Sequence, residues 1–235
     1  MRFLLIVSFT LLILNCEDKQ TSKQNNTTLV KDSTSVKIPT KENSKNEVKE
    51  DFPILTDANA MEFFLEYEKE HKEDKIRVTT DYGEIDIKLY EKTKFHRANF
   101  IYLTKLKYFN GTQFYRVVEN FIIQGGNSDD YNIAKRRRKI GKYLLPPDTK
   151  RGYTHKRGAV SMPSSEIENA YKLASPYQFF IVQRPSGADY LDKGYTVFGE
   201  VIKGLDVVDE INKVETDEGE WPLQNVYIRK VEIID

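Results

Sequence analysis

Cysteine is almost absent from the 235-residue sequence, because Cys16 is the only one, so the chain can form no internal disulfide and no cysteine-based zinc site. Histidine is also scarce, and the three residues His71, His96 and His155 lack the spacing of metal ligands. The charge is balanced, with 36 Lys+Arg against 36 Asp+Glu. We therefore expect no metal site and no nucleic-acid partner.

The N-terminal segment, MRFLLIVSFTLLILNC, has one arginine followed by an apolar run over residues 3–14. That run is too short to span a bilayer comfortably, and it fits the charged and apolar regions of a secretory signal. Residues 1–16 resemble a bacterial lipoprotein signal, in which the cysteine, here Cys16, is lipidated and becomes the new N-terminus. The alternatives are an ordinary secretory signal with an incidental cysteine, or a short N-terminal anchor helix. Lipidation would hold the protein at a membrane of the cell envelope, facing the periplasm or the cell surface.

The next segment, residues 17–52, is polar, mixed in charge and without periodicity, which predicts a disordered tether. Such a tether would let a folded domain stand away from its anchor. Beyond it, we expect a helical extension over 53–75 and a folded domain over 76–235. A domain of that length can bury a proper core.

The extension carries a helical pattern over about 58–72. Its apolar residues recur at helical spacing: Met61, Phe64 and Leu65. Thr56 or Asp57 can cap the start of this helix. The helix is expected to bury its apolar face, either as a cap on the following domain or as a face for a partner.

From Ile76 onward the period changes to two, as in Ile85, Ile87 and Leu89. Helices are expected at about 95–107 and at 205–211. Short strands are expected at 112–118, 121–124, 158–162, 178–183, 196–201 and 225–233. Many short strands with two helices indicate a mainly β domain, a closed or nearly closed barrel.

Six blocks of this domain occur in the order seen in one family: TTDYGEIDIKLY, NFIYL, FYRVVENFIIQGG, HKRGAVSM, QFFIV and YTVFGEVIKGLDVVDEI. The domain thereby resembles the cyclophilins, which are peptidyl-prolyl cis/trans isomerases. This resemblance implies an eight-stranded antiparallel closed β-barrel capped by two α-helices, with the helix at 58–72 as an addition. It also implies proline-containing polypeptide substrates and no cofactor. The lipoprotein-like start resembles the membrane-anchored cyclophilins of Bacteroidetes-type bacteria.

Arg116 stands out in the block FYRVVENFIIQGG. Strand alternation puts Phe114, Arg116 and Val118 on one face, where an arginine among apolar residues is costly unless it is satisfied. The resemblance assigns Arg116 the central catalytic role in the family. The alternative is an ordinary strand arginine paired with Glu119 or another surface acid.

The resemblance also implies a set of substrate-binding residues: Phe121, Ile122, Gln124, Pro163, Ser164, Gln178, Phe180, Leu191 and Tyr195. Gln124 would bond the substrate backbone and help hold Arg116, and Phe180 would floor the proline pocket. Plain core packing is the competing explanation for the apolar members of the set. Tyr190 stands where cyclosporin-sensitive relatives carry tryptophan, so tight cyclosporin binding is not expected.

Two functions follow from these residues. The first is a lipid-anchored, monomeric prolyl isomerase that assists the folding of exported proteins. The second is a weakly active or inactive cyclophilin-like module that binds proline-containing segments, as a chaperone or scaffold. It is suggested by Pro163 and by the altered SPY segment that precedes Gln178. The basic run KRRRK at 135–139 is expected to be a solvated insertion loop, with weak membrane contact as the alternative.

Overall fold

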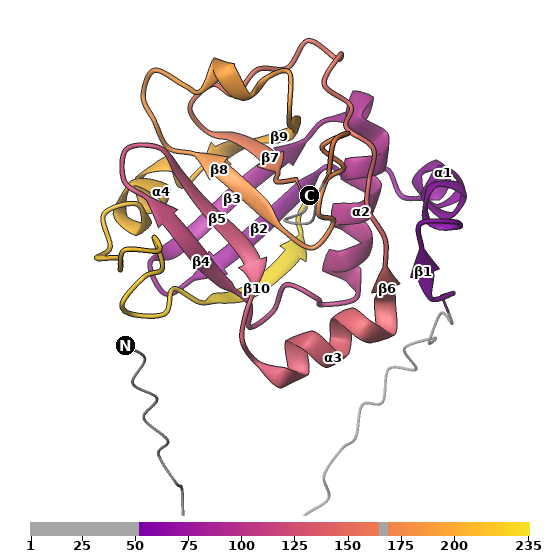
Figure 1. Cartoon of the computed structure of the whole chain (residues 1–235), viewed down its shortest axis with the longest axis horizontal. Coiled ribbons are helices and arrows are strands. Elements are labelled where there is room, and N and C mark those ends of the chain that lie inside the picture. Colours follow the sequence, from indigo (N-terminus) through magenta and orange to yellow (C-terminus); the bar gives the residue numbers. More distant parts are fainter. Residues whose placement is uncertain (1–51, 165–168) are drawn as a thin grey trace, which may run out of the picture. The chain divides into compact units, whose positions relative to one another are not determined.

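The computed structural model describes residues 52–164 and 169–235 (Figure 1). The predicted signal over 1–16, Cys16 and all but the last residue of the predicted tether lie outside the described residues. Within the described ranges, no helix has both the length and the apolar character needed to cross a membrane.

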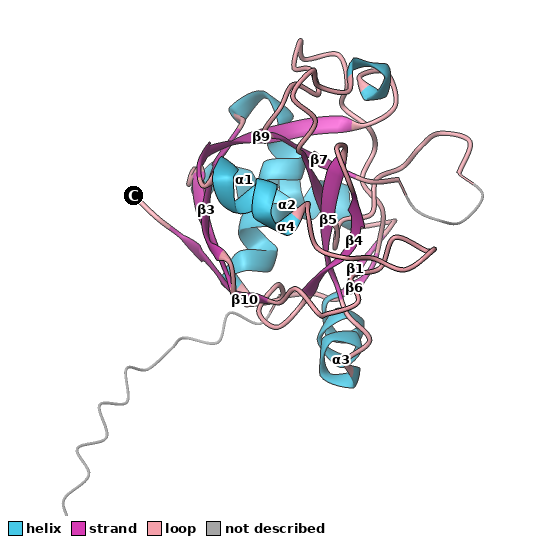
Figure 2. Cartoon of the chain, turned by 90° about the vertical axis from the view of Figure 1, so that its left-hand side faces the viewer, coloured by secondary structure: helices cyan, strands magenta, loops and turns pink. Residues whose placement is uncertain are grey.

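Eight antiparallel strands form one sheet that curls into a nearly closed barrel, as Figure 2 shows. They are β2 (Lys75–Thr80), β3 (Gly83–Leu89), β4 (Gln113–Val118), β5 (Ile122–Asn127), β7 (Ala159–Met162), β8 (Phe179–Val182), β9 (Thr196–Lys203) and β10 (Ile228–Ile233). Their order in the sheet is β10-β2-β3-β9-β7-β8-β5-β4. The two end strands approach each other where Phe114 N donates to Val226 O at 2.9 Å. The predicted barrel is confirmed.

The barrel interior is filled by large apolar side chains. The fully buried aromatic residues of this core include Phe100, Phe109, Phe114, Phe179 and Phe198. Alternation in β2 and β3 places Ile76, Ile85 and Ile87 in the same core. These strands form because the period-two pattern allows one face to be buried while the other stays polar.

The predicted barrel helices are present as α2 (Lys94–Lys105) and α4 (Leu205–Ile211). Two short 3₁₀ helices, η1 (Glu91–Thr93) and η2 (Asp189–Leu191), also occur. Helix α2 packs against β9 and β10, whereas α4 packs against β3. Most of α2 is buried, including the polar residues His96, Arg97 and Asn99.

The extension forms helix α1 (Ala60–Glu70), inside the predicted range. The predicted cap is wrong: Asn59 precedes the helix, and its Oδ1 accepts a hydrogen bond from Thr56 N at 2.7 Å. Asp57 Oδ1 instead accepts from Leu144 N at 2.8 Å. Leu65 is exposed rather than part of the apolar face.

Helix α1 covers α2 through a cluster of aromatic rings. The rings of Phe52, Phe63 and Tyr67 lie 5.0–6.1 Å from one another or from Tyr102 on α2, between ring centroids. The question that the sequence left open is therefore answered in favour of a cap, because the apolar face of α1 is buried within this chain.

The basic run lies in a helix, α3 (Tyr131–Ile140), so the prediction of a loop is wrong. Asp130 caps the helix, since its Oδ1 accepts from Asn132 N at 2.6 Å. Ile133 and Ile140 are buried beneath it. Directly after α3, β6 (Gly141–Lys142) pairs in parallel with β1 (Leu55–Thr56), which joins the extension to the domain.

Candidate active site

A cavity of about 440 Å³ brings most of the predicted site residues together. Its lining consists of Arg116, Phe121, Ile122, Gln124, Pro163, Ser164, Phe180, Tyr190, Leu191 and Tyr195. Every predicted catalytic and substrate-binding residue except Gln178 is therefore in the lining. A larger cavity of about 610 Å³ lies between β1, α3 and β6 and contains none of them. We treat the smaller cavity as the candidate active site, because polar and apolar groups converge there.

The apolar wall of the candidate site belongs to a second hydrophobic cluster, separate from the barrel core. Its buried members are Ile122, Ala159, Phe180, Val182, Ala188 and Val197. Phe121, Leu191 and Tyr195 pack against it partly buried. Tyr190 is exposed, and its ring is stacked on Phe121 with centroids 6.0 Å apart. Phe180 therefore packs in this hydrophobic cluster and also lines the cavity.

Arg116 reaches the cavity because of a β-bulge in β4. The register against β5 shifts between Phe114 and Arg116, with Tyr115 as the extra residue. Phe114 and Val117 are buried in the barrel core, whereas Arg116 and Val118 belong to the other face. The predicted shared face of Phe114 and Arg116 is therefore wrong, because the bulge interrupts the alternation.

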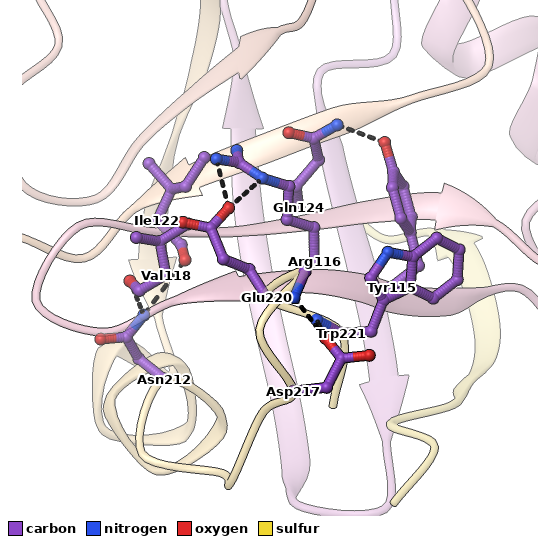
Figure 3. Close-up of polar contacts among 10 residues, drawn as sticks. Tyr115, Arg116, Val118, Ile122, Gln124, Asn212, Asp217, Glu220 and Trp221 are labelled. Carbon is purple, nitrogen blue, oxygen red and sulfur yellow. Dashed lines mark hydrogen bonds and ion pairs between the residues drawn. The ribbon is translucent and has the colours of Figure 1, made fainter. Parts of the chain in front are cut away.

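The guanidinium of Arg116 is paired with Glu220, as Figure 3 shows. Nε donates to Glu220 Oε2 at 2.7 Å, and Nη2 lies 2.6 Å from the same oxygen. The partner is therefore an acid from the loop before β10 and not Glu119. The side chains of Arg116 and Glu220 are 35% and 42% exposed, so the pair is open to solvent and to a ligand.

Tyr115, the bulge residue, connects the two predicted glutamines. Gln124 Nε2 donates to Tyr115 Oη, which in turn donates to Gln178 Oε1 at 3.1 Å. In the described part of the chain, Gln124 has no hydrogen bond to Arg116, which departs from its expected role in holding the arginine. Tyr115 was not predicted as a site residue, because an aromatic residue in an apolar strand is indistinguishable from a core residue.

His155 packs against Phe180, one of the residues that line the cavity. Its ring lies parallel to Phe180, with centroids 5.8 Å apart and an interplanar angle of 12°. Nδ1 lies 2.6 Å from Asp192 Oδ1, and Nε2 lies 3.0 Å from Ser161 Oγ. Burial lowers the pKa of His155, and the hydrogen bond to Asp192 opposes that shift. Ser161 is fully buried, so this array orients groups and offers no accessible nucleophile.

The two ends of the segment after β7 are joined by backbone contacts. Ser175 N donates to Pro163 O at 2.8 Å, and Ser164 forms a β-bridge with Ala174. Residues 165–168 between them lie outside the described residues. Pro163 and Ser164 therefore sit at a fixed edge of the cavity.

Comparison with known proteins places this geometry in a family. The family model described as cyclophilin type peptidyl-prolyl cis-trans isomerase/CLD matches residues 75–233. The chain belongs to the cyclophilin-type peptidyl-prolyl isomerases. A peptidyl-prolyl cis-trans isomerase of Acinetobacter baylyi is 34% identical over 145 residues, which covers 60% of this chain and 73% of that protein. The family expected from the sequence is thereby confirmed.

Two further relatives show the range of the family. The peptidyl-prolyl cis-trans isomerase-like 2 of Rhizopus delemar is 34% identical over 169 residues, covering 71% of this cyclophilin and only 30% of that protein. A cyclophilin-type isomerase of Cryptosporidium parvum, solved in the presence of the dipeptide Ala-Pro, has the same fold with a TM-score of 0.56 and 24% identity. That similarity covers 68% of this chain and 99% of the solved one.

Proposed function

We propose that this cyclophilin catalyses cis/trans isomerisation of X–Pro peptide bonds. The observation that carries the proposal is a half-exposed guanidinium, Arg116, at an apolar cavity that also contains the amide of Gln124. The apolar wall around Phe180 suits the proline ring, and the amide suits the substrate backbone. The Ala-Pro dipeptide used with the Cryptosporidium parvum relative supports the same class of ligand.

The chemistry follows from the electronic structure of the X–Pro bond. Rotation is slow because the nitrogen lone pair is shared with the carbonyl, and uncatalysed exchange takes roughly 10–100 s. In the twisted state the lone pair returns to the nitrogen and can accept a hydrogen bond from the Arg116 guanidinium. The planar ground state accepts that bond much less, so the interaction stabilises the transition state selectively. Reaching a turnover of about 10 s⁻¹ requires roughly 4 kcal/mol.

The cellular role is also part of the proposal. We infer that Cys16 is lipidated, that the protein is held at a membrane of the cell envelope, and that it assists the folding of exported proteins. The support is the apolar run that ends at the only cysteine, followed by a polar segment before the folded domain. This arrangement resembles the anchored cyclophilins of Bacteroidetes-type bacteria. We propose that the protein acts as a monomer.

The test is the exchange rate of a short Ala-Pro peptide, measured by NMR with the full chain in detergent micelles. We expect cis/trans exchange to accelerate in proportion to the protein concentration, because each active site turns over independently. Peptide binding, seen as shifts of the peptide signals, without acceleration over several X–Pro sequences would contradict the enzyme. It would favour the alternative, a module that binds proline-containing segments without turnover.

A further inference from the structure

Glu220 contacts the candidate site from a distant part of the chain, 104 residues from Arg116. It binds the guanidinium along one edge, with Oε2 within 2.6–2.7 Å of both Nε and Nη2. Within the described residues, Nη1 takes part in no hydrogen bond. The edge bound by Glu220 is therefore occupied, and Nη1 remains available to a ligand.

The loop that presents Glu220 has a defined conformation. Asp217 Oδ1 accepts hydrogen bonds from Gly219 N at 2.8 Å and from Trp221 N at 2.9 Å. Glu220 itself has a φ of +65°, which a residue with a side chain rarely adopts. Its carbonyl accepts from Val117 N at 2.9 Å, the residue directly after Arg116. These bonds fix the backbone that carries the Glu220 side chain relative to β4.

The pair is too exposed to be explained by stability. Ion pairs between exposed side chains contribute little to folding, because water screens them and two long side chains must be ordered. The pair does restrict the position of the guanidinium, which is carried on three methylene groups and would otherwise sample many rotamers. Figure 3 shows Glu220 reaching the end of the Arg116 side chain from the loop.

We propose that Glu220 is a positioning residue, which holds the Nε–Nη2 edge of Arg116 and thereby directs Nη1 at the substrate. The proposal rests on the isomerase function proposed above. A guanidinium that is ordered before the substrate arrives loses less entropy in the transition state. This role could not be predicted from the sequence, because Glu220 lies in a polar segment with several other acids.

The test compares Glu220→Ala and Glu220→Gln with the wild type in peptide exchange measured over a range of peptide concentrations. For Glu220→Ala we expect kcat to fall about tenfold with little change in KM, because the lost interaction belongs to the transition state. Glu220→Gln keeps an acceptor oxygen of the same reach, so its kcat should fall only about threefold. The matched control is Asp81→Ala, which removes a carboxylate from another exposed pair, with Arg229, and should leave kcat unchanged.

The outcomes separate this inference from the proposed function. An active wild type whose kcat is matched or exceeded by Glu220→Ala would overturn the positioning role, since Glu220 would then be idle or would restrain Arg116. If Glu220→Ala does not fold, Glu220→Gln decides: a reduced kcat supports the role and an unchanged kcat overturns it. A wild-type protein that does not accelerate peptide exchange would contradict the isomerase function and, with it, the positioning role.

Discussion

At the scale of single residues, the candidate site depends on one extra residue in β4. The block around Arg116 predicted the arginine as a site residue, but strand alternation alone put it on the same face as Phe114. The bulge at Tyr115 moves it to the cavity side. The bulge depends on pairing with β5, so the sequence of β4 alone does not reveal it. The contact of Glu220 with Arg116 forms only when the chain folds, because the two residues are 104 positions apart.

His96 on α2 is the residue with the clearest effect on stability. It is buried, and neither ring nitrogen has a hydrogen-bond partner among the described residues. Burial lowers its pKa to about 3. Below about pH 6.5 the unfolded chain therefore binds a proton that the folded chain does not, so stability falls as the pH falls.

We expect His96 alone to reduce the free energy of unfolding by about 2 kcal/mol between pH 7 and pH 5. His96→Leu removes this titration and leaves the other histidines in place. Urea unfolding at both pH values checks the prediction, with the loss of stability on acidification smaller in the variant. An identical loss in the two proteins would show that His96 is protonated in the fold.

At the scale of elements, sequence periodicity predicted the helices and strands whose apolar residues are regularly spaced. Helices α2 and α4 and the barrel strands carry apolar residues at the required spacing, and they occur at or near the expected positions. Helix α3 was not predicted because the basic run KRRRK dominates its sequence, and its buried residues are just Ile133 and Ile140. The pairing of β1 with β6 joins two-residue strands that no local pattern marks.

Gly141 makes this pairing possible. Its φ is +133°, and a Cβ atom there would lie 1.9 Å from Leu55 O. Gly141→Ala should therefore separate β6 from β1 and loosen α1, which hydrogen exchange of the α1 amides would report as faster exchange. The matched control is Gly152→Ala, also at positive φ, where a Cβ would meet nothing within 4 Å. Unchanged exchange in Gly141→Ala would mean that α1 is held by its aromatic contacts alone.

At the scale of the whole molecule, the six sequence blocks were enough to predict the barrel and to list nearly all residues that line the cavity. One block, FYRVVENFIIQGG, contributes four of the lining residues, which are Arg116, Phe121, Ile122 and Gln124. The supports behind this lining, Tyr115 and the His155–Asp192 pair, could not be listed, because their partners come from other strands and loops.

The proposed anchoring at a membrane concerns the full chain and is testable with Cys16→Ser. We expect this variant to lose incorporation of labelled fatty acid and to leave the membrane fraction, because the acyl chains supply most of the membrane affinity. Ser22→Ala in the predicted tether serves as the control and should behave as the wild type. Unchanged membrane association of Cys16→Ser, without label in the wild type, would indicate an uncleaved anchor helix instead.

The central claim is that the Arg116 guanidinium accelerates rotation about the X–Pro bond, and its most direct test is peptide exchange by Arg116→Ala and Arg116→Lys. We predict that kcat/KM falls roughly 100-fold in Arg116→Ala, and that Arg116→Lys recovers little of it because lysine lacks the planar fork. Arg229→Ala, which removes another exposed arginine paired with a carboxylate, should retain full activity. A folded Arg116→Ala protein as active as the wild type would contradict the account.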